Sequence, residues 1–182
     1  MRNSTLRALY IFNGIFIFAG MLLGPLYAIY VNAIDTNILA ITWSTVANIS
    51  ADTIFAFIIP KVVDRRQNIK ELLLLGYLTR AVAFSLFIFA RNIESIILLQ
   101  VLIGIGQGLG MPAFDTIFAE HLETGEHIAD YSEWHLISNV VMVAGTFIGG
   151  FIVKYYGFDI IFVLMALLSL VSFFGIYFNR DL

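Results

Sequence analysis

The segment IILLQVLIGIGQGLGMPAFDTIF, residues 96–118, decides what kind of protein this chain can form. It holds one ionisable side chain, Asp115. About 20 apolar residues are enough for a helix to cross the ~30 Å hydrocarbon core of a membrane. The apolar residues run continuously rather than alternating, which excludes a barrel strand of ~10 residues. The segment therefore predicts a transmembrane helix.

Five further apolar segments of similar length accompany it. The chain has 182 residues, of which 60% are hydrophobic and 13% charged, whereas a soluble domain has about 45–50% and about 25%. These figures exclude a soluble enzyme and a nucleic-acid binder, and the absence of Cys excludes disulfides and thiol chemistry. We predict an all-α integral membrane protein that forms one domain. Its six expected helices cover residues 8–31, 38–60, 72–90, 96–118, 136–156 and 160–178.

The Lys and Arg residues are placed unevenly along these segments. With a cytoplasmic N-terminus, seven of the ten fall in cytoplasmic segments, Arg91 and Lys154 lie outside, and Arg80 lies within a span. Cytoplasmic segments of membrane proteins carry an excess of positive charge. We therefore expect both termini to be cytoplasmic. The seven residues are Arg2, Arg7, Lys61, Arg65, Arg66, Lys70 and Arg180.

The first and fourth helices carry matching Gly and Pro interruptions. Gly24-Pro25 and Gly110-Met111-Pro112 lie at nearly the same distance from the starts of their helices. These helices cross the membrane in opposite directions, and paired interruptions are typical of inverted repeats in transporters. We expect two inverted three-helix repeats with helix-break hinges at these positions. Close packing of small residues also explains the glycines, but not the paired prolines.

Two ionisable residues lie deep inside the expected spans. Asp52 lies ~12 Å up the second helix and Arg80 lies ~14 Å up the third from the same side. Their matching depths predict an ion pair within the membrane. The pair has two interpretations with about equal support: a salt bridge that locks the two helices together, or a proton site at Asp52 whose protonation frees Arg80 for an anionic substrate group. Intramembrane charges are costly and usually functional.

Other polar side chains recur at helical spacing within the spans. Thr42, Thr45, Asn48 and Asp52 share one face of the second helix. A polar face in a membrane helix turns toward a cavity or another helix. We assign these and similar residues to a pathway for substrate or protons. The full set is Asn13, Thr45, Asn48, Asp52, Gln100, Gln107 and Asn139.

Several motifs in order along the chain resemble those of the major facilitator superfamily. The loop that follows Pro60 matches the family's G-x-x-x-D-[RK]-x-G-[RK]-[RK] pattern at Asp64 and Arg65, with Pro60 and Gln67 in place of its glycines. Residues 100–108 are similar to its R-x-x-x-G-x-x-x-G helix, with Gln100 in place of the Arg. The glycines of residues 145–150 and the Tyr-Gly-Phe of residues 156–158 also fit. The resemblance covers nearly the whole chain.

The resemblance implies half of a transporter fold, because members normally have two six-helix bundles in parallel orientation. It implies that helices 1, 2, 4 and 5 line a cavity while helices 3 and 6 lie outside. It also implies a charge cluster that latches the cytoplasmic ends of the helices. That cluster consists of Asp64, Arg65, Arg66, Asp115 and Glu120.

We therefore expect a half-size secondary transporter, not an enzyme, in the cell membrane of a prokaryote. It would move a small solute by alternating access as a parallel homodimer or with a sister half, and protons are the candidate coupling ion. The alternative is a non-transporting scaffold or regulatory subunit that keeps the bundle. No cofactor is expected. His121, His127 and His135 lie in or just after an acidic loop, residues 120–133, and their spacing matches no zinc pattern.

Overall fold

The computed structural model of the chain describes residues 4–62, 68–122 and 127–179. Every regular element in these ranges is helical, as continuous apolar runs require. A short 3-10 turn joins α1 to α2, so these two helices continue one another. The elements are α1 (Ser4–Leu23), η1 (Gly24–Leu26), α2 (Tyr27–Ile34), α3 (Ile38–Val62), α4 (Ile69–Phe87), α5 (Ile93–Glu120), α6 (His127–Tyr156) and α7 (Phe158–Tyr177).

Five of the helical segments are long and apolar enough to cross a membrane. The helix that falls outside this set is α4, which has 19 residues and includes Lys70, Glu71 and Arg80. The first two of these charges lie in its first turn, at the end of the bundle, and only Arg80 lies midway along it. The five segments are Thr5–Ile34, Ile38–Ile59, Ile93–Glu120, His127–Tyr156 and Phe158–Tyr177.

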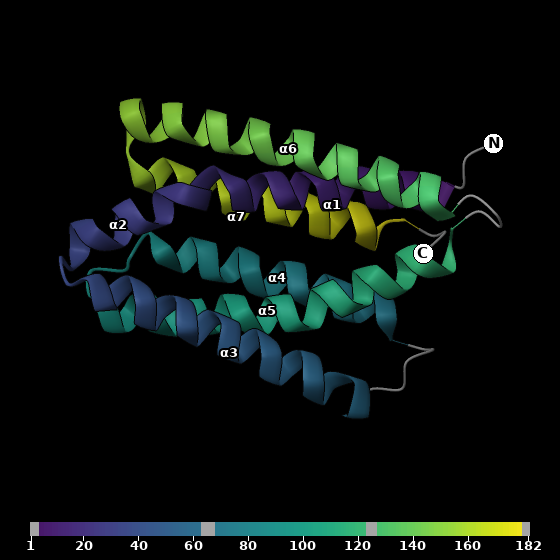
Figure 1. Cartoon of the computed structure of the whole chain (residues 1–182), viewed down its shortest axis with the longest axis horizontal. Helices are drawn as coiled ribbons and strands as arrows, with labels where there is room; N and C mark the ends of the chain where they lie inside the picture. The colour runs from purple at the N-terminus through teal and green to yellow at the C-terminus, as the bar shows by residue number, and fades with distance from the viewer. Residues whose placement is uncertain (1–3, 63–67, 123–126, 180–182) are drawn as a thin grey trace.

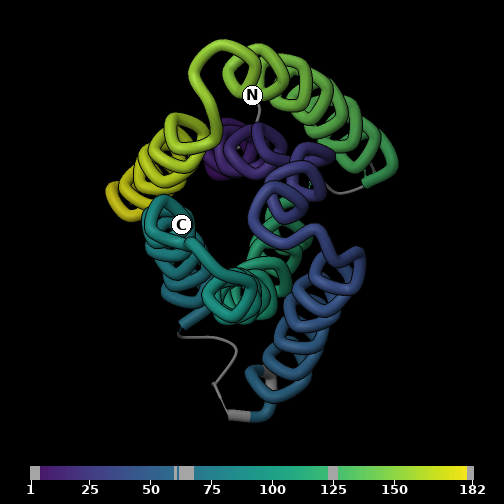
Figure 2. The backbone as a smooth tube through the Cα atoms, turned by 90° about the vertical axis from the view of Figure 1, so that its left-hand side faces the viewer, coloured from purple at the N-terminus to yellow at the C-terminus, as the bar shows by residue number. Residues whose placement is uncertain are grey.

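The helices lie side by side in two layers, α1, α6 and α7 in one and α3, α4 and α5 in the other (Figure 1). Within the first layer α6 and α7 both pack on α1, and within the second α3 and α4 both pack on α5. Contacts between α4 and α7 join the layers, and α3 and α6 lie at opposite edges of the bundle (Figure 2). Helix α1 begins and α7 ends at the same end of the bundle.

Glycines permit the closest helix crossings. A Cβ added at Gly108 of α5 would lie 2.6 Å from the carbonyl oxygen of Asp52 on α3, and one added at Gly149 of α6 would collide with the Leu22 carbonyl on α1. Small residues are typical of such interfaces in membranes, because they let two backbones approach closely. Each of the two layers therefore contains a tight, glycine-dependent crossing.

The buried apolar core has two parts, one toward each end of the bundle. In the first, Tyr30 packs against Phe162 of α7 with ring centroids 4.9 Å apart and donates a hydrogen bond of 3.2 Å to the Phe87 carbonyl. In the second, Trp134 of α6 packs against Phe114 of α5 at 5.1 Å and stacks on Tyr10 of α1 at 5.5 Å. The aromatic side chains thus close the space between the layers at both ends.

Two sequence-based expectations about the helices need correction. Helix α6 begins at His127, so residues 127–133, expected in an acidic loop, form its first turns. This turn is anchored because Asp130 is buried and Tyr131 packs on Phe118. Helix α5 is continuous, so the break expected at Gly110 and Pro112 is absent.

The two expected hinges therefore differ in structure. Gly24 and Pro25 lie in the 3-10 turn, where the α-helical pattern is interrupted. Pro112 instead lies inside α5. A proline removes one helical hydrogen bond, and the surroundings of a membrane helix can compensate for that loss without a break.

Candidate functional site: a polar cavity between the two layers

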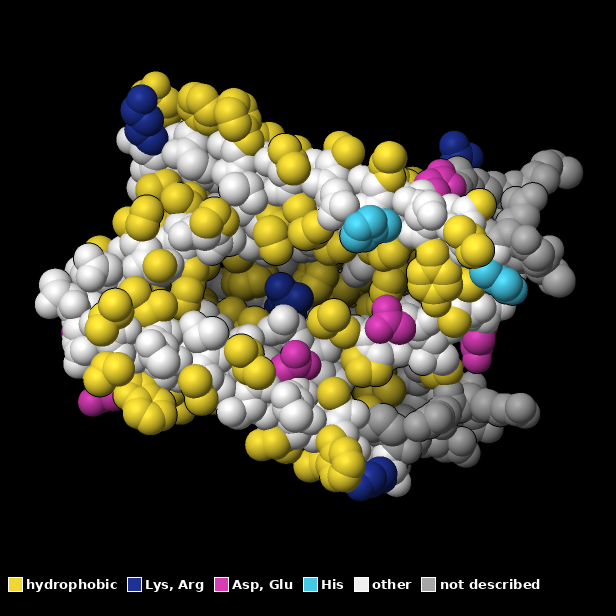
Figure 3. Space-filling view, viewed as in Figure 1, with side chains coloured by type: hydrophobic (Ala, Val, Ile, Leu, Met, Phe, Trp, Pro, Cys, Tyr) yellow, Lys and Arg dark blue, Asp and Glu magenta, His cyan; other side chains and the backbone are white. Residues whose placement is uncertain are grey.

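A cavity of about 350 Å³ lies between the two layers. It opens on one face of the molecule as a hollow surrounded by apolar side chains, with a basic side chain at its floor (Figure 3). Its lining comes from four helices, α1, α4, α5 and α6. The polar and charged members of the lining are Asn13, Tyr77, Arg80, Gln107, Asp115, Trp134 and Ser138.

Among the described residues that line this cavity, Arg80 is the one basic side chain. Its guanidinium lies over the Phe16 ring, with Cζ 4.3 Å from the ring centroid, and 5.7 Å from that of Phe84. Its stem lies against Gly106 of α5, where a Cβ would come within 2.8 Å of Cγ, and its head reaches Gly20 of α1. The side chain therefore extends from α4 toward α1.

The expected ion pair between Asp52 and Arg80 is not formed. No salt bridge joins the two side chains in the described part of the chain, although they are close enough to act on each other electrostatically. The prediction was wrong because α3 and α4 are not neighbours: each packs on α5. Asp52 is half-buried on α3 and does not line the cavity.

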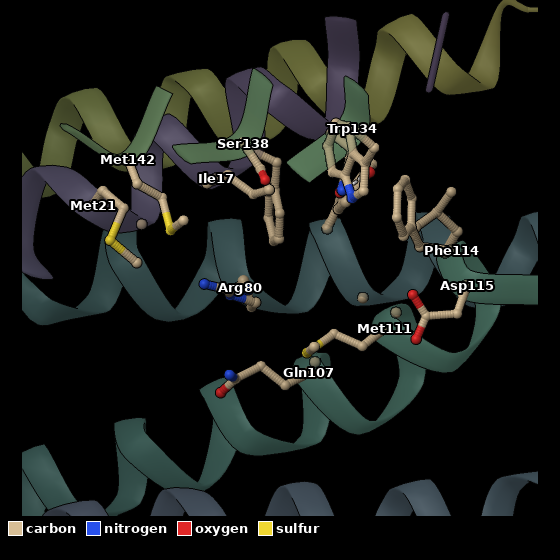
Figure 4. Close-up of a pocket in the computed structure, with 18 residues that line it drawn as sticks. Ile17, Met21, Arg80, Gln107, Met111, Phe114, Asp115, Trp134, Ser138 and Met142 are labelled. Carbon is tan, nitrogen blue, oxygen red and sulfur yellow. Dashed lines mark hydrogen bonds between the residues drawn. The ribbon is translucent and has the colours of Figure 1, made fainter. Parts of the chain in front are cut away.

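Two predicted pathway residues contribute amides to the cavity. Asn13 is buried and accepts a hydrogen bond of 2.8 Å from the Tyr77 hydroxyl, which ties α1 to α4. The side-chain oxygen of Gln107 is buried and has no hydrogen-bond partner among the described residues. Figure 4 shows Gln107 and Met111 on α5 below Arg80. The side-chain oxygen of Gln107 is therefore an acceptor that the described residues leave unused.

The other predicted pathway residues lie outside this cavity. Asn48 donates a hydrogen bond of 3.0 Å to the backbone carbonyl of Gln100, whose side chain is buried between helices. Thr45 is exposed and bonds to a carbonyl of its own helix, and Asn139 is exposed on α6. The lining thus includes α4, which the resemblance placed outside, and omits α3, which it placed inside.

Only two members of the expected cytoplasmic charge cluster, Asp115 and Glu120, lie among the described residues. Asp64, Arg65 and Arg66 lie outside the described residues. Asp115 lines the cavity at the Phe114 side, away from Arg80 (Figure 4), and Glu120 is exposed at the end of α5. Asp115 is therefore placed to act within the cavity.

Sequence reasoning missed several residues of the lining. Trp134, Ser138 and Met142 follow one face of α6 at four-residue spacing, and Tyr77 precedes Arg80 by three residues on α4. This helical spacing is visible in the sequence, but a Trp near the end of a span is equally typical of the aromatic belt at a membrane interface. In the described ranges no three His, Asp or Glu residues are grouped so that they could hold a metal ion.

These features define the class of the protein: a multi-pass helical membrane protein with a polar cavity inside its bundle, as in membrane transporters. A comparison with models of protein families matches residues 9–181 to the Major Facilitator Superfamily. The chain belongs to this superfamily of transporters and is about half the usual size. A comparison with curated proteins gives no match.

Proposed function

We propose that the chain is one half of a secondary transporter that moves a small solute across the membrane by alternating access. The observation that carries this proposal is the cavity. It is lined by Arg80 and by Gln107, whose side-chain oxygen has no partner among the described residues, inside a bundle of this superfamily. Buried polar groups without partners are costly, and in membrane helices they mark substrate pathways.

The pattern of helix contacts supports two inverted three-helix repeats within the bundle. In such a repeat α1 corresponds to α5, α3 to α6 and α4 to α7. The contact of α3 with α5 then corresponds to that of α6 with α1, and both are present. The contact of α4 with α5 likewise corresponds to that of α7 with α1. The contact between α4 and α7 joins two corresponding helices, as a two-fold relation between the repeats requires. In this arrangement all six helical segments cross the membrane, α4 included.

A second bundle would complete the transport pathway, and we propose that it is a second copy in parallel orientation. Polar side chains on the outer edges of the bundle support this proposal, because Thr42 and Thr45 on α3 and Asn139 on α6 are exposed. Polar groups in a membrane seldom face lipid. The charge bias inserts every copy the same way, in our proposal into the cell membrane of a prokaryote. A sister half of different sequence is the alternative partner.

Proton coupling is proposed at Asp52, which is half-buried and has no salt bridge to Arg80. The test is solute uptake into proteoliposomes, with labelled anionic, zwitterionic and neutral solutes, with and without an inward proton gradient. A proton-coupled transporter accumulates one class only with the gradient, and Asp52→Asn abolishes accumulation but not gradient-independent exchange. Absence of uptake and exchange for every class would favour the non-transporting scaffold.

A further inference from the structure

We propose that the cavity binds a small organic monoanion, with its anionic group on Arg80 and its apolar body along the α1 and α6 side of the cavity. This proposal deepens the transport function above by naming the class of its solute. It depends on the surroundings of Arg80 and on the distribution of polar groups along the cavity.

The first argument is the charge of Arg80, which Asp52 offsets only at a distance and without a salt bridge. Arg80 is the one basic side chain among the described lining residues. Within the described ranges no Asp or Glu forms a salt bridge with it. Its Nε is buried and makes no hydrogen bond to any described residue. A cation in a membrane interior needs a partner, because removing it from water costs several kcal/mol. An anionic ligand would supply that partner.

The second argument is the placement of the guanidinium. The guanidinium lies over the Phe16 ring, with Cζ 4.3 Å from the ring centroid, and the glycines at positions 20 and 106 leave room for its stem and head. The N–H groups of a guanidinium lie at its edge, so an aromatic ring over its face does not block two parallel hydrogen bonds to a carboxylate. Phe16, Gly20 and Gly106 therefore make a site that accommodates the Arg80 side chain beside the cavity.

The third argument concerns the rest of the ligand. Gln107 offers a buried acceptor oxygen without a partner among the described residues, which suits a hydroxyl or amide N–H on the ligand. Opposite Arg80 lie Ile17, Met21 and Met142, which suit an apolar body (Figure 4). Asp115 lies toward the far side of the cavity, where it would repel a second negative charge. The ligand is therefore a monoanion and not a dianion.

The chain carries its own reporter for a binding experiment. Of its two tryptophans, Trp134 lines the cavity and Trp43 is exposed on α3. In a Trp43→Phe background the fluorescence of Trp134 is titrated at pH 7.5 with hexanoate, hexanamide and hexylamine, which share an apolar chain and differ in charge. We expect hexanoate to bind at least about tenfold more tightly than the other two, and succinate, a dianion, to bind more weakly than hexanoate.

Variants locate the anion site. Arg80→Gln should abolish the preference for hexanoate over hexanamide, whereas Arg91→Gln, which removes an exposed cation outside the cavity, should preserve it. If Arg80→Gln does not fold, the relative affinities of the three probes for the protein with Arg80 intact still test whether the cavity prefers an anion. Equal binding of all three, or tighter hexylamine binding, would overturn the proposal.

The same titration separates this proposal from the transport function. Hexanoate selectivity without uptake of any solute class would support the anion site and contradict transport. Uptake of a neutral solute by a protein that shows no hexanoate selectivity would contradict the anion site and support transport.

Discussion

The hydroxyl of Tyr77 donates a hydrogen bond of 2.8 Å to the side-chain oxygen of Asn13, and both residues are buried in the interior of the bundle. The bond connects α4 in one layer to α1 in the other, at the wall of the cavity. It is a polar link between the layers where most other contacts are apolar. Its loss should therefore loosen the two layers relative to each other.

Tyr77→Phe should lower the free energy of unfolding by about 1 kcal/mol, because interhelical hydrogen bonds in membranes contribute ~0.6 kcal/mol on average and the orphaned amide oxygen adds a penalty. Unfolding in mixed micelles with increasing SDS measures this. Tyr155→Phe removes a hydroxyl from an exposed ring on α6 and is the matched control. Equal stability of the two variants would contradict a structural role for this bond.

Gly149→Ala should destabilise the protein by about 1–3 kcal/mol, since the new methyl group collides with the Leu22 backbone and forces α6 away from α1. The adjacent Gly150→Ala is the control, because a Cβ there meets nothing within 4 Å. Thermal unfolding in detergent compares the two. Similar losses in both variants would mean that α6 and α1 do not pack in this register.

Cysteine labelling tests the orientation in the membrane. Thr36 is exposed between α2 and α3, at one end of the bundle, and Ala119 is exposed near the end of α5, at the other. In this chain without Cys, Thr36→Cys should react with an impermeant thiol reagent in intact cells, and Ala119→Cys should react only after the cells are permeabilised. The reverse pattern would place both termini outside.

Thr45→Cys tests the parallel homodimer. Thr45 is exposed on α3, on the face that we assign to the second bundle, so oxidation in native membranes should give a disulfide-linked dimer. Leu75→Cys, which is exposed on α4, is the control and should remain monomeric. A Thr45→Cys protein that stays monomeric under oxidation while it still transports would favour a sister half as the partner.

The sequence alone predicted which segments become helices and what environment they occupy. This information is local, because a chain in lipid must satisfy its backbone hydrogen bonds within each segment. The motifs around Asp64 and Gln100 likewise sufficed to indicate the superfamily, since they depend on order and spacing. The start of α6 was misplaced because the charges of residues 127–133 concealed a helical turn that the aromatic core anchors.

Only the tertiary structure decided which polar residues meet. Asp52 and Arg80 have equal depths, but depth says nothing about which helices are neighbours, and glycine-dependent crossings place both α3 and α4 on α5. Arg80 consequently extends toward Phe16 and Gly20 on α1, far along the chain from its expected partner. Hydropathy fixes the helices one at a time, whereas the cavity depends on which small surfaces of different helices fit together, and that fit is not encoded in any single segment.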